Sequence, residues 1–192
     1  MKNLINIPCG VTVKFNSSMF LEILEKYGAS GWNAWIDAIN RQNLVYPSWD
    51  TRNSIPSFQI EFILNDIDLS NRSLDGIDLT LVYVSKGDFS NSSLYGAKIL
   101  VANHSDFSGC DLRTSFLNSC DVSKANFTEA MIDDVIWDRA FFYKGNPPIG
   151  LPADITARLQ QLEPDTVEMP EPKQIVCLAS VEDAAHWVMA KD

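Results

Sequence analysis

The chain has 192 residues, 46% of them apolar, which suits one domain with appendages and a real core. Its formal net charge of −10 argues against direct nucleic-acid binding, because such binding needs Lys and Arg to neutralise phosphates. No secretory signal and no membrane-spanning run can be read from the sequence, so we expect a cytoplasmic protein with no membrane partner.

The first predicted segment, residues 1–61, is helical. The stretch SSMFLEILEKYGASGWNAWIDAINRQNL places apolar residues at helical spacing on both sides of Gly28 and Gly31. Ser17 or Ser18 is a suitable N-cap for the first helix, and the two glycines separate it from a second. Five acidic and five basic side chains give this segment no net charge.

A period of five governs residues 62–144. One apolar residue, here called the repeat centre, recurs at every fifth position in two runs of eight. Small residues often stand two places before a centre, Asp or Asn one place before it, and Ser or Thr one place after it. The centres are Leu64, Leu69, Leu74, Leu79, Val84, Phe89, Leu94 and Ile99, then Phe107, Leu112, Leu117, Val122, Phe127, Ile132, Trp137 and Phe142.

Neither a strand nor a helix explains this period. A continuous strand would send alternate centres to opposite faces, and a continuous helix would rotate them around its axis. A short extended piece followed by a tight turn returns each centre to the same side, and the density of Asp, Asn and Ser favours such turns. Stacked turns of this kind make a solenoid whose backbone hydrogen bonds join neighbouring layers.

The repeats IDLSN, GDFSN, SDFSG, CDLRT and ANFTE resemble the pentapeptide-repeat family, whose consensus is A(D/N)LXX. In that family, four repeats form a square coil and the coils stack as a right-handed quadrilateral β-helix. The resemblance implies a mainly β fold of about four coils over residues 62–144, with residues twenty apart stacked, as Phe107 on Phe127. Arg72 departs from the pattern at a usually small inward position. Its repeat is distorted, or its side chain extends out of the coil.

The two runs of centres do not join in register. Ile99 and Phe107 are eight residues apart, so we predict that Leu100–Asp106 bulges at a corner between the second and third coils. Loops on rigid scaffolds often carry function, which makes Asn103 and His104 candidate partner-binding residues. A neutral insertion is the alternative.

The stretch GASGWNAW resembles a G…WNxW segment that precedes the coils in many members of the family. We therefore predict that residues 1–61 cap the first coil, because an open β-helix end exposes unpaired strand edges and bare core. Trp32 and Trp35 would pack inside this cap. The alternative is that they form a ligand-binding aromatic patch.

Residues 145–192 are an acidic C-terminal segment with eight acidic and three basic side chains. Two adjacent prolines in KGNPPIGLP end the repeats. LPADITARLQQL predicts a helix, EPDTVEMPEPK a linker, and QIVCLASVEDAAHWVMAKD a short strand and then a helix capped by Ser180. The apolar stripe of that last helix could dock on the body or on a second chain, as a homodimer.

No catalytic set is recognisable in the sequence. The two histidines, His104 and His186, lie in different segments, and there is neither a Gly-rich phosphate loop nor metal-ligand spacing. The four cysteines form no CxxC pair, so we expect reduced thiols. We therefore predict that the protein is not an enzyme and holds no cofactor and no metal.

Binding to another protein, as a scaffold or regulatory module, is the predicted function. The resemblance supplies an alternative: some pentapeptide-repeat proteins are dimers with an acidic, rod-like surface that mimics DNA. Those proteins bind DNA gyrase or topoisomerase IV and alter quinolone susceptibility. The coil region here carries twelve acidic and seven basic side chains, a net charge of −5. Candidate contact residues for a mimic are Asp133, Asp134 and Asp138, near the last coil.

Overall fold

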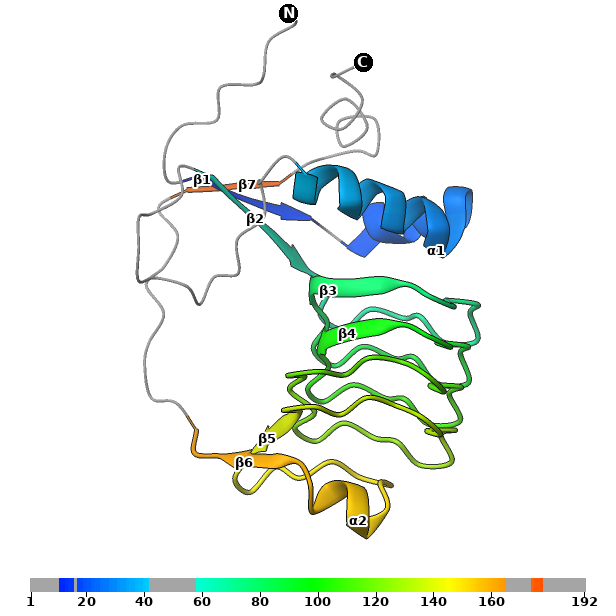
Figure 1. The fold of residues 1–192 in the computed structure, drawn as a ribbon. Helices are drawn as coiled ribbons and strands as arrows, with labels where there is room; N and C mark the ends of the chain where they lie inside the picture. Colours follow the sequence, from blue (N-terminus) through cyan, green and yellow to red (C-terminus); the bar gives the residue numbers. More distant parts are fainter. Residues whose placement is uncertain (1–10, 16, 42–57, 165–173, 178–192) are drawn as a thin grey trace, which may run out of the picture. The chain divides into compact units, whose positions relative to one another are not determined.

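The computed structural model describes residues 11–15, 17–41, 58–164 and 174–177 (Figure 1). By packing, the chain divides into two units, residues 1–63 with 168–192, and residues 64–167. Each unit is described below by itself.

The first unit contains a parallel sheet that the sequence pattern did not predict. Strand β1 (Val11–Phe15) pairs with β2 (Phe58–Ile63) on one side and with β7 (Gln174–Cys177) on the other. Only the third of these strands was expected. The segment 1–61 is therefore not wholly helical, since VTVKF and FQIEFI alternate in the way that a strand requires.

Helix α1 (Ser17–Arg41) confirms the expected pair of helices, because its backbone leaves the helical conformation at Gly28 (φ 65°, ψ −172°). Glycine adopts a positive φ without a steric penalty, so the chain can bend there. The ring of Phe20 meets that of Trp32 edge to face at 4.5 Å, and Trp32 is fully buried. Trp32 thus packs in the core of its unit. Capping of the repeats by this unit stays a prediction.

The repeat unit makes one tight turn in nearly every repeat. The carbonyl of a centre accepts the N–H group three residues later, as Phe107 does from Cys110 at 3.1 Å. The residue two places after the centre has a positive φ, as type II turns require. These residues are Asp66, Asn71, Gly76, Lys86, Asn91, Gly96, His104, Gly109, Thr114, Ser119, Lys124, Glu129, Asp134 and Arg139.

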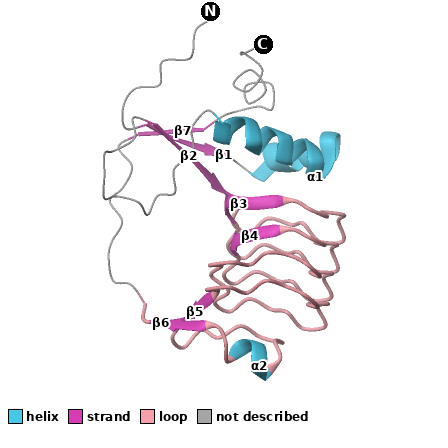
Figure 2. Cartoon of the chain, in the orientation of Figure 1, coloured by secondary structure: helices cyan, strands magenta, loops and turns pink. Residues whose placement is uncertain are grey.

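Successive layers of this unit are joined by parallel backbone pairing. Asp106 bridges Asn126 and Asp111 bridges Met131, each twenty residues on. The longest regular pieces are β3 (Asp78–Tyr83), β4 (Lys98–Val101) and β5 (Phe141–Tyr143). Figure 2 shows that most of the unit is extended chain between turns, stacked layer on layer. The arrangement is β-helix-like.

The centres form the core of the stack. Fourteen of the sixteen are buried, and only Ile132 and Trp137, in the last layers, are partly exposed. The Phe107 ring lies parallel to that of Phe127 at 5.3 Å, as predicted, and to that of Phe89 at 4.8 Å on its other side. Aromatic side chains at one repeat position therefore form a continuous stack through three layers.

Small polar residues two places before the centres bond to the layer above. The hydroxyl of Ser92 donates to the Leu69 carbonyl at 2.6 Å and accepts the Arg72 N–H at 2.9 Å. The Cys110 thiol donates to the Phe89 carbonyl, and burial raises its pKa to about 12. The Ser115 hydroxyl is buried with no hydrogen-bond partner.

Arg72 does not distort its repeat. Its carbonyl accepts the N–H of Ser93 at 2.9 Å, the same bond that other repeats make, and its side chain is half-buried. Of the two expectations, the distorted repeat was therefore wrong.

The register change between the two runs differs from the prediction. The pairing shifts between Leu79 and Tyr83, because Leu79 lies opposite Ile99 whereas Tyr83 lies opposite Val101. The layer that contains β4 is thus two residues shorter than the layer that contains β3. Ala102 is buried in it as an additional inward residue. The expected bulge over Leu100–Asp106 was wrong. His104 takes a regular turn instead, and its N–H donates to the Ser123 carbonyl at 2.7 Å.

Beyond the repeats the chain forms α2 (Ala153–Thr156) and β6 (Gln160–Leu162), which pairs with β5. A helix over all of LPADITARLQQL was therefore wrong in its second half. Its last residues pair with the edge of β5, where Gln160 N–H donates to the Ala140 carbonyl at 2.9 Å. Edge pairing here outweighs helix propensity. The predicted linker and final helix lie outside the described residues.

Among the residues that the structure describes, no helix has the length and apolar character needed to cross a membrane.

The close approach of Gly150 to the backbone of Thr128 can be tested by substitution. A Cβ atom there would lie 2.5 Å from the Thr128 nitrogen, whereas a Cβ at Gly145 meets nothing within 4 Å. Both glycines have positive φ, 80° and 83°, so both Ala variants carry the same backbone strain. We expect Gly150→Ala to lower the free energy of unfolding by about 1–3 kcal/mol more than Gly145→Ala, from overpacking. Urea unfolding measures this, and equal losses would contradict the close approach.

Two serines at equivalent positions should respond oppositely to removal of the hydroxyl. Ser115→Ala removes an unsatisfied buried group and should stabilise the protein by about 1 kcal/mol. Ser92→Ala leaves the Arg72 N–H without its acceptor and should destabilise by about 1–3 kcal/mol. The midpoints of urea unfolding decide the matter, and a loss of stability for Ser115→Ala would show that its hydroxyl is satisfied.

Candidate protein-interaction surface

Exposed large apolar residues gather around one set of turns in the repeat unit. Seven such residues are exposed in the described chain, and four of them flank the turns that hold Tyr95, Arg113 and Asp133. Because equivalent positions of successive layers lie one above the other, these turns form a column. We call the following residues the Tyr95 surface: Tyr95, Arg113, Phe116, Met131 and Ile136.

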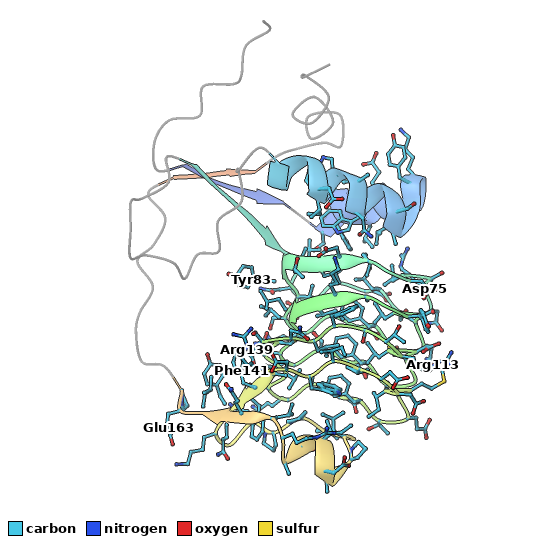
Figure 3. All side chains as sticks on the ribbon, viewed as in Figure 1. Asp75, Tyr83, Arg113, Arg139, Phe141 and Glu163 are labelled. Atoms are coloured by element: carbon cyan, nitrogen blue, oxygen red, sulfur yellow. The ribbon has the colours of Figure 1, made fainter. Side chains whose placement is uncertain are left out.

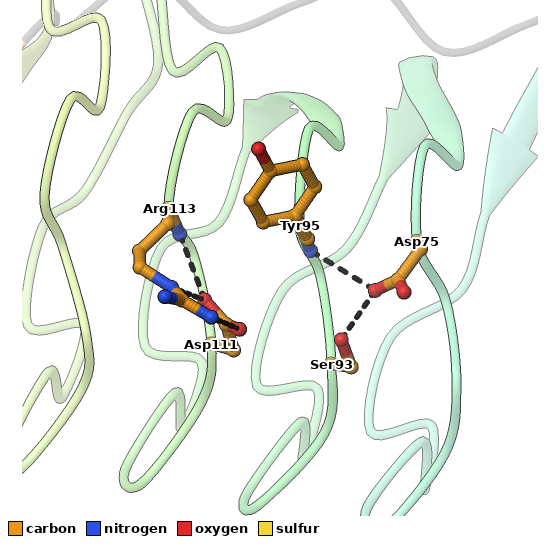
Figure 4. Close-up of polar contacts among 5 residues, drawn as sticks. All are labelled: Asp75, Ser93, Tyr95, Asp111 and Arg113. Carbon is orange, nitrogen blue, oxygen red and sulfur yellow. Dashed lines mark hydrogen bonds and ion pairs between the residues drawn. The ribbon is translucent and has the colours of Figure 1, made fainter.

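Arg113 is held in place before any partner arrives. Its Nε and Nη2 atoms donate to both carboxylate oxygens of Asp111, at 2.8 and 2.7 Å, and its guanidinium lies 5.9 Å from the centre of the Tyr95 ring (Figure 4). The hydrogen bond from Arg113 holds the pKa of Asp111 below its ordinary value, so this pair stays ionised. A bidentate pair of this kind fixes the geometry of the arginine.

The backbone of Tyr95 is fixed from the layer above. One carboxylate oxygen of Asp75 accepts the Tyr95 N–H at 3.2 Å and the hydroxyl of Ser93 (Figure 4). The ring itself is 47% exposed. Tyr95 therefore combines a rigid backbone with an accessible aromatic face, as Tyr does at interface hot spots.

Apolar side chains flank these turns on both sides. Phe116 pairs with Ile136 across adjacent layers, and their exposed fractions are 44% and 43%. On the other side, Met131 is 45% exposed and pairs with Asp111. Aromatic residues, Met and Arg are the types that are enriched in the centres of protein–protein interfaces.

The structure separates the candidate residues that the sequence suggested. Asp133 and Asp134 are exposed and lie in the same column of turns as Tyr95 and Arg113, since Thr114 N–H donates to the Asp133 carbonyl at 3.1 Å. Asp138 lies in the next turn along the chain. It forms an exposed ion pair with Arg139, which Figure 3 draws on the other side of the stack from Arg113.

Asn103 and His104 lie in a different column, half a layer away from Asp133. Their turn stacks on that of Lys86, whose N–H donates to the Asn103 carbonyl at 3.0 Å. His104 is exposed, while the side-chain oxygen of Asn103 is buried without a hydrogen-bond partner. The five predicted residues therefore do not form one site.

A second set, the Asp column, consists of Asp68 and Asp88, which are exposed, and Asp106, which is partly buried. These residues bridge one another in successive layers, and each carboxylate accepts the N–H two residues later at 2.9 to 3.0 Å. Hydrogen bonds from Ser70 hold the pKa of Asp68 below its ordinary value. The result is a ladder of carboxylates in fixed orientations.

Within the described ranges, no three His, Cys, Asp or Glu side chains lie close enough to hold a metal ion. The thiols of Cys110 and Cys120 are buried and unpaired. Burial raises the pKa of both thiols, which makes them poor nucleophiles.

Sequence reasoning missed the Tyr95 surface although its signal was present. Asp, Asn or Ser usually precedes a centre, but Phe116, Met131 and Ile136 occupy that outward place with large apolar side chains. Large apolar side chains at an outward position that is otherwise polar indicate an interaction surface, because they do not contribute to solubility.

The family model for pentapeptide repeats (8 copies) matches residues 103–135. The chain therefore contains pentapeptide repeats over these residues. Such repeats imply a β-helix-like fold, and proteins that carry them are generally non-enzymatic and act in protein interaction or as scaffolds. No curated protein matches the chain.

Proposed function

We propose that the protein is a non-enzymatic scaffold or regulatory module of the cytoplasm that binds another protein through the Tyr95 surface. In this proposal the repeats form a right-handed quadrilateral β-helix of about four coils, which acts as a rigid support. The observation that carries the proposal is the fixed Arg113 beside the exposed Tyr95 ring, with Phe116, Ile136 and Met131 around them.

Rigidity supports this assignment in energetic terms. Binding costs free energy when loops and side chains must be ordered at the interface. Here the Asp111 carboxylate already holds Arg113, and interlayer hydrogen bonds already hold the backbone of Tyr95. Little ordering cost remains, so a modest number of aromatic and apolar contacts suffices for specific affinity.

Truncation of the surface should weaken partner binding without unfolding the protein. Tyr95→Ala combined with Arg113→Ala should cost at least about 2 kcal/mol of binding free energy, roughly thirtyfold in Kd. Affinity capture from the native host, quantified by mass spectrometry, identifies proteins retained by the wild type, and titration then gives Kd for each variant.

The matched control is Asn118→Ala combined with Glu129→Ala, two exposed or partly exposed positions in other turns. A partner held equally by all three proteins, with unchanged unfolding midpoints, would place the binding site elsewhere.

A second candidate function is the DNA-mimicking inhibition or protection of DNA gyrase or topoisomerase IV. The Asp column favours it, because stacked carboxylates in fixed orientations form a regular line of negative charge. Asp133, Asp134 and Asp138 stay candidate contacts for the same function. Such an interaction would rest on attraction to a basic groove and would weaken with salt.

Gyrase supercoiling in the presence of the purified protein tests the mimic. Inhibition should be lost on reversing either Asp68 and Asp88 or Asp133 and Asp134 to Lys, two variants with the same change of net charge. The set whose reversal abolishes inhibition is the one that the enzyme contacts. Absence of any effect at micromolar protein would dismiss the mimic and leave the Tyr95 surface untouched.

A further inference from the structure

Positive charge gathers in one column of this acidic protein. Lys86, His104 and Lys124 each stand two places after an inward residue, and all three are exposed. Backbone bonds stack their turns: Lys86 N–H donates to the Asn103 carbonyl, and His104 N–H to the Ser123 carbonyl. We call these three residues the Lys86 column.

Two lysines of this column differ from the other basic side chains of the repeat unit. Five basic side chains of the repeat unit form ion pairs with carboxylates, namely Lys98, Arg113, Arg139, Lys144 and Arg158. By contrast, Lys86 and Lys124 form no ion pair with any described residue. Layers of a β stack lie about 4.8 Å apart, so these two charges repeat at roughly 10 Å with His104 between them.

A lysine outside this column shows which group an exposed ammonium accepts. Lys144 Nζ lies 2.9 Å from the Glu163 carboxylate, and Glu163 directly follows strand β6. Lys86 and Lys124 present the same ammonium group and form no ion pair with any described residue.

The neighbouring charges decide between a peptide and a nucleic acid. Asp66 stands at the equivalent turn position in the layer above Lys86, and Asp88 and Asp106 follow Lys86 and His104 by two residues. A continuous phosphate backbone would be repelled by these carboxylates and by the net charge of −10. Separate carboxylates on flexible side chains can reach the lysines one at a time.

Asn103 adds an acceptor that a peptide backbone can satisfy. Its side-chain oxygen is buried and has no hydrogen-bond donor, next to His104 in the same turn. The N–H groups of a bound backbone are donors, whereas phosphate and carboxylate oxygens are not.

We propose that the Lys86 column is a second binding surface, which takes an acidic, extended segment of a partner protein. Glu or Asp side chains of that segment pair with Lys86 and Lys124, and its backbone lies across the turn of Asn103 and His104. This surface is independent of the Tyr95 surface, from which it is separated by half a layer.

The probe is a fluorescein-labelled peptide of alternating Glu and Ala residues, titrated with the full chain at low salt and followed by fluorescence anisotropy. Lys86→Ala with Lys124→Ala should raise Kd at least tenfold. The matched control is Lys98→Ala with Arg139→Ala, which gives the same net charge but removes cations that are already paired. The control should change Kd less than twofold.

Three results would overturn the proposal. The first is that the wild type binds no acidic peptide. The second is that both double variants weaken binding equally, which would mean general charge attraction. The third is that a single-stranded oligonucleotide of equal length binds more tightly than the peptide and loses its binding to the Lys86 and Lys124 variant, which would assign the column to phosphates. Unchanged unfolding midpoints ensure that all variants are compared as folded proteins.

Discussion

The turn that follows most repeat centres, with its third residue in the left-handed conformation, is the constraint on which the rest of this protein depends. The turn changes the chain direction so that the next centre points inward again. The residue with positive φ, two places after the centre, stays on the outside of the stack. Eleven non-glycine residues adopt this conformation, which costs roughly 1–2 kcal/mol for a residue with a side chain. The interlayer backbone bonds and the buried centres offset that strain, so the conformation persists only because the layers stack.

Stacking also determines how the surface is organised. A residue type that recurs at one repeat position becomes a column in space, with a spacing fixed by backbone pairing. The same scaffold therefore carries the Asp column, the Lys86 column and the Tyr95 surface at different turns and sides. Each surface is defined by sequence positions about twenty residues apart, and none of them is visible as a contiguous motif.

The period of five was enough to predict the core, because burial of one side chain per turn leaves its mark on every repeat. It predicted Phe107 on Phe127, and glycine chemistry predicted the break of helix α1 at Gly28. It did not reveal that the register change shortens a layer, since counting from Ile99 to Phe107 does not show that the small Ala102 also faces inward. Strands β1 and β2 were not predicted from the sequence, because the strands that they pair with lie far away along the chain.

The candidate site was less predictable than the fold for a related reason. Asp133 and Asp134 were chosen for their charge and lie beside Arg113, but charge alone could not say that Tyr95 and Phe116 share their surroundings. Predicting these neighbours requires the number of residues in each layer. His104 was chosen for a loop that is in fact a regular turn, and its neighbours Lys86 and Lys124 are recognisable only once the layers are aligned.

Residues that pair across adjacent layers are mostly twenty positions apart, and this spacing limits how the chain can change in length. An insertion of five residues keeps every later centre inside the stack, so the core tolerates it. The same insertion moves every later outward residue to the next corner, which would carry Lys124 away from Lys86 and Asp133 away from Arg113. Only a whole layer of about twenty residues leaves both the interior and the exterior aligned. Growth of the chain by duplication is therefore restricted more tightly by the alignment of its outward columns than by the packing of its core.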